Sequence, residues 1–230
     1  MRYALSDPHG EYDLFRRLLN EIAFGETDEM IVLGDVIDKG RESVRLLRYV
    51  LSQPNITLLI GNHEYDFLKY YHGVMSRLED GFDADDALGE IRAFFGEEGA
   101  SLDWEALDRL ENCPLWLEGE DYLCVHAGVK LTASGEIVHP SRTEAEILVY
   151  DREFKGQNVI PTGGKCVLFG HTPTRYLTGR DEILLYPREG VTAPRSIKDC
   201  AKIHLDCGSY LSGRLGCLRL EDCALFYVSE

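Results

Sequence analysis

Three apolar runs near the start of the chain each stop at a short polar loop. Residues 3–5, 30–33 and 56–60 are apolar stretches of the length expected for buried strands. Between them, apolar residues recur at helical spacing over 14–22 and again over 44–51, which predicts two helices. The alternation of strand and helix predicts an α/β fold.

The pattern changes after the third run. Residues 65–112 contain helical spacings interrupted by acidic breaks and no convincing strand, which predicts a helical insertion. Short strands are predicted again after Pro114, at 122–125, 166–169, 183–186, 203–206, 216–220 and 224–228. A chain of 230 residues is long for one domain and short for two. We therefore expect a single domain, 1–230, that carries the insertion.

Two segments are interpreted as solvent-exposed loops. Within the insertion, the acidic run of Asp83, Asp85 and Asp86 is most simply a solvated loop. Residues 187–202 contain Gly190, Pro194 and several basic side chains, a composition typical of an exposed loop. The insertion and this second loop are the parts expected to decide which substrate the protein accepts.

Charge narrows the range of partners. The sequence has 24 Lys and Arg against 40 Asp and Glu, a formal net charge of −16, so its field repels nucleic-acid backbones and anionic lipid. No apolar run approaches the roughly 18 residues that a membrane span needs. Seven cysteines without a Cys-x-x-Cys pair indicate reduced thiols. We therefore expect a soluble cytoplasmic protein with no nucleic-acid or membrane partner, and a monomer is compatible with this sequence.

Polar side chains that can bind metals follow the predicted strands. They are Asp7 and His9, Asp35 and Asp38, Asn62 and His63, then His126 and His171. Because the carboxyl ends of strands in an α/β sheet form the ligand crevice, these side chains can converge there. Each motif taken singly could be a turn or a helix cap. Together, oxygen and imidazole donors without thiolate suit manganese, iron or zinc.

The same motifs carry a family resemblance. SDPHG at 6–10, GDVIDKG at 34–40, GNHE at 61–64, VHAG at 125–128 and GHT at 170–172 resemble the calcineurin-like metallophosphoesterase signature. The wording is similar to the phosphoprotein phosphatase branch, which includes phage protein phosphatases and bacterial diadenosine tetraphosphatases. The resemblance covers roughly 1–64 and 115–225 and implies a β-sandwich flanked by helices.

The resemblance implies two divalent metal ions, manganese first, with iron or zinc as alternatives. One ion would bind Asp7 and His9, the other would bind Asn62, His126 and His171, and Asp35 would bridge them. Two such ions can activate a shared water for in-line attack on phosphorus and neutralise the phosphoryl oxygens.

Four further residues receive roles from the resemblance. His63 would protonate the leaving oxygen, and Asp38 would orient its ring. Lys39 stands where the family usually has a phosphate-clamping arginine, with Arg41 as an alternative source of charge. Arg152 is similar to a second phosphate arginine of the family, although it could equally be a surface residue paired with a neighbouring acid.

Three functions remain open at this point. The first hypothesis is a serine/threonine-type protein phosphatase that hydrolyses phosphomonoesters in phosphoproteins or small phosphoesters. The alternative is a diadenosine tetraphosphatase or a related nucleotide pyrophosphohydrolase, which would use the same ligands. A non-catalytic binding protein that keeps the fold is disfavoured, because the set of expected ligands and the His63–Asp38 pair are complete.

Overall fold

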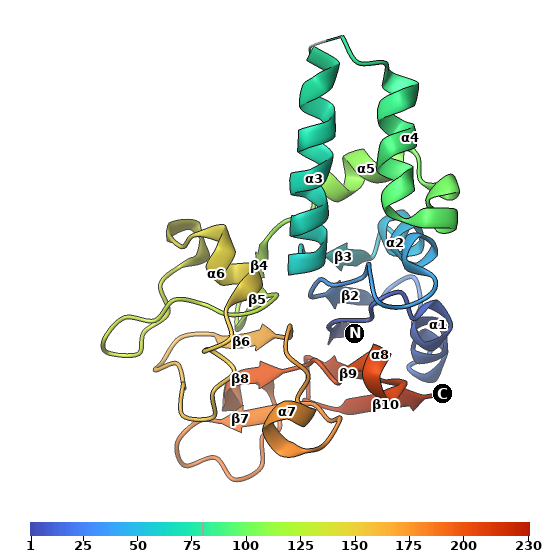
Figure 1. The fold of residues 1–230 in the computed structure, drawn as a ribbon. Coiled ribbons are helices and arrows are strands. Elements are labelled where there is room, and N and C mark those ends of the chain that lie inside the picture. Colours follow the sequence, from blue (N-terminus) through green and yellow to red (C-terminus); the bar gives the residue numbers. More distant parts are fainter. Residues whose placement is uncertain (80) are drawn as a thin grey trace.

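The chain folds into two five-stranded sheets that face one another (Figure 1). The structure is a computed structural model that describes residues 1–79 and 81–230, so residue 80 of the predicted insertion lies outside the described residues. The first sheet contains β1 (Arg2–Leu5), β2 (Glu29–Val32), β3 (Ile56–Leu58), β9 (Arg214–Arg219) and β10 (Leu225–Ser229). The second contains β4 (Trp116–Glu118), β5 (Tyr122–Val125), β6 (Cys166–Phe169), β7 (Leu184–Pro187) and β8 (Cys200–His204).

Both sheets are mixed, with a parallel centre. In the first sheet, β1, β2 and β3 are parallel, β9 pairs with β1 in the antiparallel direction, and β10 pairs antiparallel with β9 at the edge. In the second, β5, β6 and β8 are parallel, with β4 and β7 antiparallel at the edges. The carboxyl ends of the parallel strands therefore lie on the same side of each sheet.

The alternation of side chains between the two faces of each strand explains why the sheets stack. In β1, Ala4 joins the core between the sheets, whereas Tyr3 and Leu5 face the opposite way. In β5, Cys124 joins the same inner core, and its neighbour Leu123 belongs to the outer core of the second sheet. Because successive side chains of a strand point to opposite faces, each sheet has two apolar faces and must be covered on both. The predicted α/β sandwich flanked by helices is confirmed.

Helices cover the outer faces. α1 (Tyr12–Glu21) and α2 (Ser43–Ser52) place buried leucines and valines against the first sheet. α6 (Ala145–Tyr150) contributes Leu148 and Val149 to the core outside the second sheet. Two single-turn helices, α7 (Arg175–Thr178) and α8 (Ser209–Ser212), follow strands of the second sheet.

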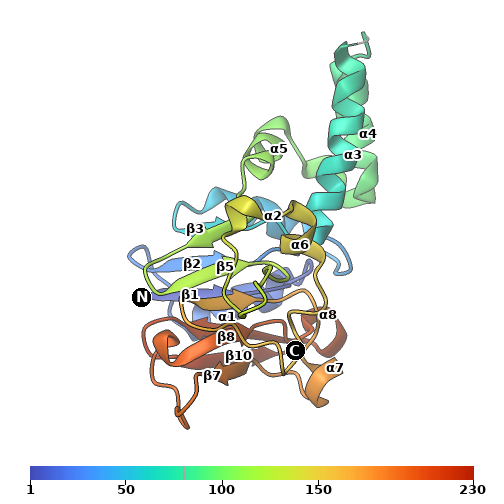
Figure 2. The ribbon, with the colours of Figure 1, turned by 90° about the vertical axis from the view of Figure 1, so that its left-hand side faces the viewer.

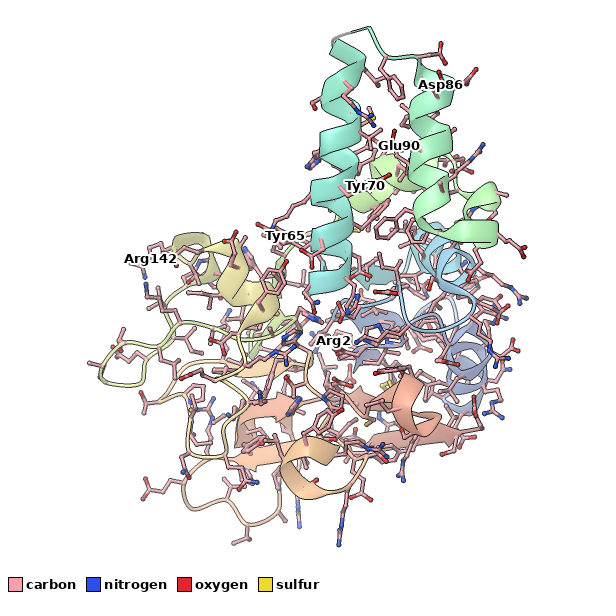
Figure 3. All side chains as sticks on the ribbon, in the orientation of Figure 1. Arg2, Tyr65, Tyr70, Asp86, Glu90 and Arg142 are labelled. Atoms are coloured by element: carbon pink, nitrogen blue, oxygen red, sulfur yellow. The ribbon has the colours of Figure 1, made fainter. Side chains whose placement is uncertain are left out.

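The segment after β3 projects from the sandwich as a helical hairpin (Figure 2). It consists of α3 (Asn62–Glu79), α4 (Ala84–Phe94), the 3₁₀ turn η1 (Gly96–Ser101) and α5 (Trp104–Glu111). Tyr70 of α3 lies between the two long helices, where its hydroxyl donates to the carbonyl of Glu90 over 3.2 Å (Figure 3). At the base of α3, the Tyr65 hydroxyl donates to Glu146 of α6 over 3.2 Å.

Three sequence interpretations are corrected by the structure. The acidic run is the start of α4, because the Asp83 side chain accepts hydrogen bonds from the backbone N–H of Asp85 and Asp86 as a helix N-cap. The predicted loop at 187–202 ends early, and its last three residues begin the buried strand β8. Short β4 and α6 were not predicted.

None of the described helices is long and apolar enough to cross a membrane.

Candidate metal centre

The predicted ligands lie where the parallel strands of the two sheets end. Asp7 and His9 follow β1, Asp35 follows β2, Asn62 begins α3 after β3, His126 follows β5 and His171 follows β6. Since the first four come from one sheet and the last two from the other, the site occupies the seam of the sandwich.

One group of donors gathers around the Nε2 atom of His126. This nitrogen lies 3.1 Å from Asn62 Oδ1, 3.2 Å from His171 Nδ1 and 3.4 Å from Asp35 Oδ1. Asn62 Oδ1 is 2.8 Å from His171 Nδ1. Four side chains from four different strand ends thus point their donor atoms at one another.

A second group gathers around the Nε2 atom of His9. This nitrogen lies 3.6 Å from Asp35 Oδ2 and 4.0 Å from Asp7 Oδ1. Asp35 therefore presents one carboxylate oxygen to each group. His63 Nε2 also lies 3.8 Å from Asp35 Oδ2, although the sequence reasoning gave His63 a different role.

Backbone carbonyls fix which nitrogens of two imidazoles can bind a cation. His126 Nδ1 lies 2.7 Å from the carbonyl of Leu33, and His9 Nδ1 lies 3.1 Å from the carbonyl of Ile37. Each Nδ1 must carry a hydrogen to make these contacts, so in the neutral ring Nε2 has a free lone pair. Such outer contacts are the usual way in which proteins orient metal-binding histidines.

Atoms with lone pairs that face one another in this way can bind a cation. Buried Asp7 Oδ1 has no hydrogen-bond partner among the described residues, and the lone pairs around His126 would repel one another if nothing positive lay between them. A divalent ion at each group would satisfy these atoms, so the residues fit the expected pair of ions.

Burial keeps the imidazoles in the form that binds metals. Loss of solvation lowers the pKa of His171 to about 3, with repulsion from His126 as a further cause, and lowers that of His9 to about 4. Burial and the carboxylates of Asp7 and Glu64 raise the pKa of Asp35. A cation bound at Asp35 would therefore displace a proton, as is general for metal sites.

His63 and Asp38 form the predicted pair. His63 Nδ1 lies 2.8 Å from Asp38 Oδ2, and its Nε2 faces the site. Partial burial works to raise the pKa of Asp38, but the N–H of Lys39 and the His63 ring lower it overall. The ionised carboxylate can therefore hold the Nδ1 proton and orient the ring.

The two basic side chains that are predicted to bind phosphate lie at different distances from the predicted ligands. Lys39 Nζ lies 3.0 Å from His9 Nε2 and 5.0 Å from the ring centroid of Tyr210. Since His9 Nε2 has one lone pair, it can face the ammonium or a metal ion, but not both. Arg152 is exposed, and its charge is among the causes that lower the pKa of His171. The structure therefore brings Lys39 into contact with the ligands and leaves Arg152 at their periphery.

The loops of the site adopt an uncommon backbone conformation. Asp7, His9, Asp35 and His171 have φ between 40° and 70°, and Asp38 and Lys39 have 70° and 65°. This left-handed region is unfavourable for residues with a Cβ and is concentrated at functional sites. Gly61 allows the loops to approach closely, since a Cβ there would lie 2.2 Å from Asp35 Oδ1.

Sequence reasoning missed Glu64, the last residue of the GNHE motif. Its side chain is fully buried, and its carboxylate accepts four backbone N–H groups, those of Asp35, Val36, Ile37 and Gly61, at 2.7–3.0 Å. Glu64 therefore holds the loop that carries Asp35 against the start of α3. The only signal in the sequence is that Glu64 closes the GNHE motif, and the motif assigned it no role.

Replacing Glu64 with glutamine should reduce stability. An NH₂ group replaces one of the two carboxylate oxygens, so two buried N–H groups lose their acceptor, and the free energy of unfolding should fall by about 2–4 kcal/mol. Urea denaturation of the metal-free protein would measure this loss. Glu221→Gln is the matched control, because Glu221 also accepts a backbone N–H, that of Arg2, but at the surface. An equal change in both variants would contradict the role of Glu64.

Comparison with known proteins shows which family has a sequence like that of this chain. The family model for calcineurin-like phosphoesterases matches residues 3–194. A relative from Chromobacterium violaceum, named symmetrical bis(5'-nucleosyl)-tetraphosphatase, is 29% identical over 191 residues, which cover 80% of this chain and 61% of the relative. The chain thus spans about six tenths of that relative's length.

Solved structures share the fold. One, provisionally assigned as a diadenosine tetraphosphatase, has a TM-score of 0.68 at 17% identity and covers 99% of this chain and 92% of its own. Another, a mutant of a cold-active protein tyrosine phosphatase, has a TM-score of 0.60 at 19% identity, with 99% and 77% covered. At these identities the likeness concerns the fold alone.

Proposed function

The chain belongs to the calcineurin-like phosphoesterase family, and on that premise we propose that it is a metal-dependent hydrolase of dinucleoside polyphosphates, with diadenosine tetraphosphate as the representative substrate. The observation that carries the proposal is the cluster of oxygen and imidazole side chains at the seam of the sandwich, in a chain that has a curated relative named a symmetrical tetraphosphatase. This reverses the order expected from the motifs, which placed protein phosphatase first.

The donor set defines what the site would hold. Asp7, His9 and Asp35 would bind one divalent ion, and Asp35 with Asn62, His126 and His171 would bind the other. Such ions, when bound, acidify water and neutralise charge on phosphoryl oxygens. The oxygen and imidazole donors suit manganese, with iron or zinc as alternatives.

The residues around the donors would complete the reaction. Water attacks the central anhydride, the bridging P–O bond breaks, and the leaving nucleoside diphosphate oxygen takes a proton. His63 would supply that proton from Nε2 and regain one from the attacking water, while Asp38 would stabilise the protonated ring through Nδ1. Lys39 would leave His9 and neutralise the polyphosphate, and Arg152 would meet its charge at the rim.

A side-by-side assay tests the proposal. The protein is stripped of metal, manganese is restored, and diadenosine tetraphosphate, a phosphoserine peptide and a phosphotyrosine peptide are compared. We expect the dinucleotide to have the highest kcat/KM and to give only ADP, the product of central cleavage. Preference for either peptide, with the dinucleotide left intact, would overturn the proposal in favour of a protein phosphatase.

Removing the Lys39 charge should weaken use of the polyphosphate. Lys39→Ala should lower kcat/KM for the dinucleotide roughly ten- to hundredfold, the effect of losing one hydrogen bond to a charged group, whereas Lys39→Arg should retain most of it. Steady-state kinetics would measure both. Arg41→Ala is the comparison, since Arg41 is exposed two residues away. If Arg41→Ala causes the greater loss, Arg41 rather than Lys39 is the clamp.

A further inference from the structure

An exposed aromatic ring lies beside the site on the helical hairpin. Phe94, the last residue of α4, is 51% exposed. Its ring centroid lies 5.1 Å from that of buried Phe67, 5.3 Å from that of Tyr70 and 5.1 Å from that of Phe95. Packing on these rings fixes the orientation of Phe94 and leaves part of it open to solvent.

The open ring forms one wall of a small cavity. The cavity has a volume of about 160 Å³ and lies between the end of α4 and the loop after β2. Its lining residues are Phe94, Phe95 and Glu98 from the hairpin, Asp38, Lys39 and Gly40 from the loop, and Ser43 at the start of α2. One cavity therefore contains an aromatic surface, the cation expected to meet phosphate and the carboxylate that orients His63.

Polar contacts hold the two walls together. The Glu98 carboxylate accepts the backbone N–H of Val44, in the first turn of α2, over 3.0 Å. Arg48 of α2 donates to the carbonyl of Ser101 over 2.5 Å. The base of the hairpin is thus fixed to the helix that follows the Lys39 loop, so the cavity is formed before any ligand binds.

We propose that Phe94 stacks on one nucleobase of the substrate, whose phosphates extend from the cavity past Lys39 to the metal donors. This inference rests on the proposed function and adds the group that recognises the nucleoside. Every base has a π-face that can stack on an aromatic ring. The cavity is below the roughly 300–1,000 Å³ of sites for whole drug-sized ligands, so it suits one flat group.

Charge sets the direction in which the nucleotide lies. Glu98 lines the end of the cavity on the hairpin, and Lys39 lines the end toward the donors. A phosphate would be repelled by Glu98 and attracted by Lys39, while the Asp38 carboxylate at the Lys39 end is paired with His63. Tyr210, which is 41% exposed, has its ring centroid 5.7 Å from that of His9. Tyr210 therefore belongs to the phosphate end, which leaves Phe94 as the surface for the base.

Phe94→Ala separates recognition of the base from chemistry at phosphorus. We expect kcat/KM for diadenosine tetraphosphate to fall about five- to 150-fold, the range for loss of one base–aromatic stack. Turnover of p-nitrophenyl phosphate, which has no base, should change less than about twofold. Phe94→Trp should retain use of the dinucleotide, and Phe94→Leu should not. Tyr176→Ala is the matched control, because Tyr176 is 68% exposed on α7 and does not line this cavity.

Binding measurements keep this test independent of the reaction. Calorimetry with the manganese-loaded protein should show weaker ADP binding in Phe94→Ala and unchanged pyrophosphate binding. If the wild type hydrolyses the dinucleotide and Phe94→Ala does so equally well, the stacking inference is wrong and the proposed function stands. If the wild type leaves the dinucleotide intact, the function fails, and equal ADP binding by both proteins then rejects the stacking inference as well. An equal loss on both substrates would assign Phe94 a structural role and also reject it.

Discussion

Asp35→Asn is expected to remove most bound metal and to lower turnover by roughly 10³-fold or more, since metal catalysis contributes several kcal/mol to the transition state. Asp35 is placed to serve both donor groups, with Oδ1 3.4 Å from His126 Nε2 and Oδ2 3.6 Å from His9 Nε2. Asparagine offers one acceptor oxygen and one NH₂ group, which cannot bind a cation. At least one donor group therefore loses its shared ligand.

Stability should respond differently from activity in this variant. Burial and neighbouring carboxylates raise the pKa of Asp35, so a neutral amide costs little in the metal-free protein. We expect the metal-free melting temperature to be maintained and the rise that manganese produces in the wild type to be lost. Elemental analysis and thermal denaturation with and without manganese would measure the two effects.

Asp28→Asn provides the control for Asp35. Asp28 accepts the backbone N–H of Gly25 and contacts the N-terminal ammonium, away from the donors. This variant should bind manganese and turn over substrate as the wild type does. An Asp35→Asn protein that keeps two ions and full turnover would refute the bridging role.

His63→Asn should leave metal content unchanged and lower turnover of alkyl phosphates by about 10²–10⁴, the typical contribution of a general acid. The ring lies 2.8 Å from Asp38 through Nδ1 and directs Nε2 toward the donors. Because a poor leaving group needs a proton most, the loss should be largest for alkyl phosphates. It should be smaller for nitrophenyl phosphate and for diadenosine tetraphosphate, whose leaving groups are stable as anions.

Kinetics across leaving groups would test that assignment. His72→Asn is the matched control, since His72 also pairs with a carboxylate, Glu111, at 2.8 Å but on the surface of the hairpin. It should retain full turnover. A His63→Asn loss of the same size for every leaving group would argue against proton donation and for a role in binding.

The sequence motifs point to side chains that the fold brings together, and the patterns of apolar residues predict the fold class but not the order of the strands. Each predicted ligand lies one to four residues after the end of a strand, so strand ends and motifs point to the same residues. The order of strands within each sheet depends on long-range pairing, such as that of β1 with both β2 and β9, which local patterns do not contain. Strand β4, with three residues, and helix α6, with six, are too short for a periodicity to emerge.

The burial of polar side chains was the other feature that the sequence did not predict. Glu64 and Lys202 read as surface residues by type, yet both are fully buried. Glu64 is satisfied by backbone N–H groups, and Lys202 Nζ donates to the carbonyls of Phe154 and Gly156. Such partners are backbone groups brought together by folding, so residue type alone does not reveal them. Phe94 shows the opposite case: it is an aromatic residue that is exposed, and its neighbours in the sequence do not indicate this exposure.

The left-handed backbone at the metal donors constrains how this protein can change. Glycine would relieve the conformational cost at Asp7, His9, Asp35 or His171, which is about 1–3 kcal/mol at each position, but it would also delete a ligand. Stability and activity thus select opposite residues at the same positions. A laboratory screen for thermal tolerance alone would favour variants that lose the centre, whereas natural sequences that retain it must acquire their stabilising substitutions elsewhere in the sandwich.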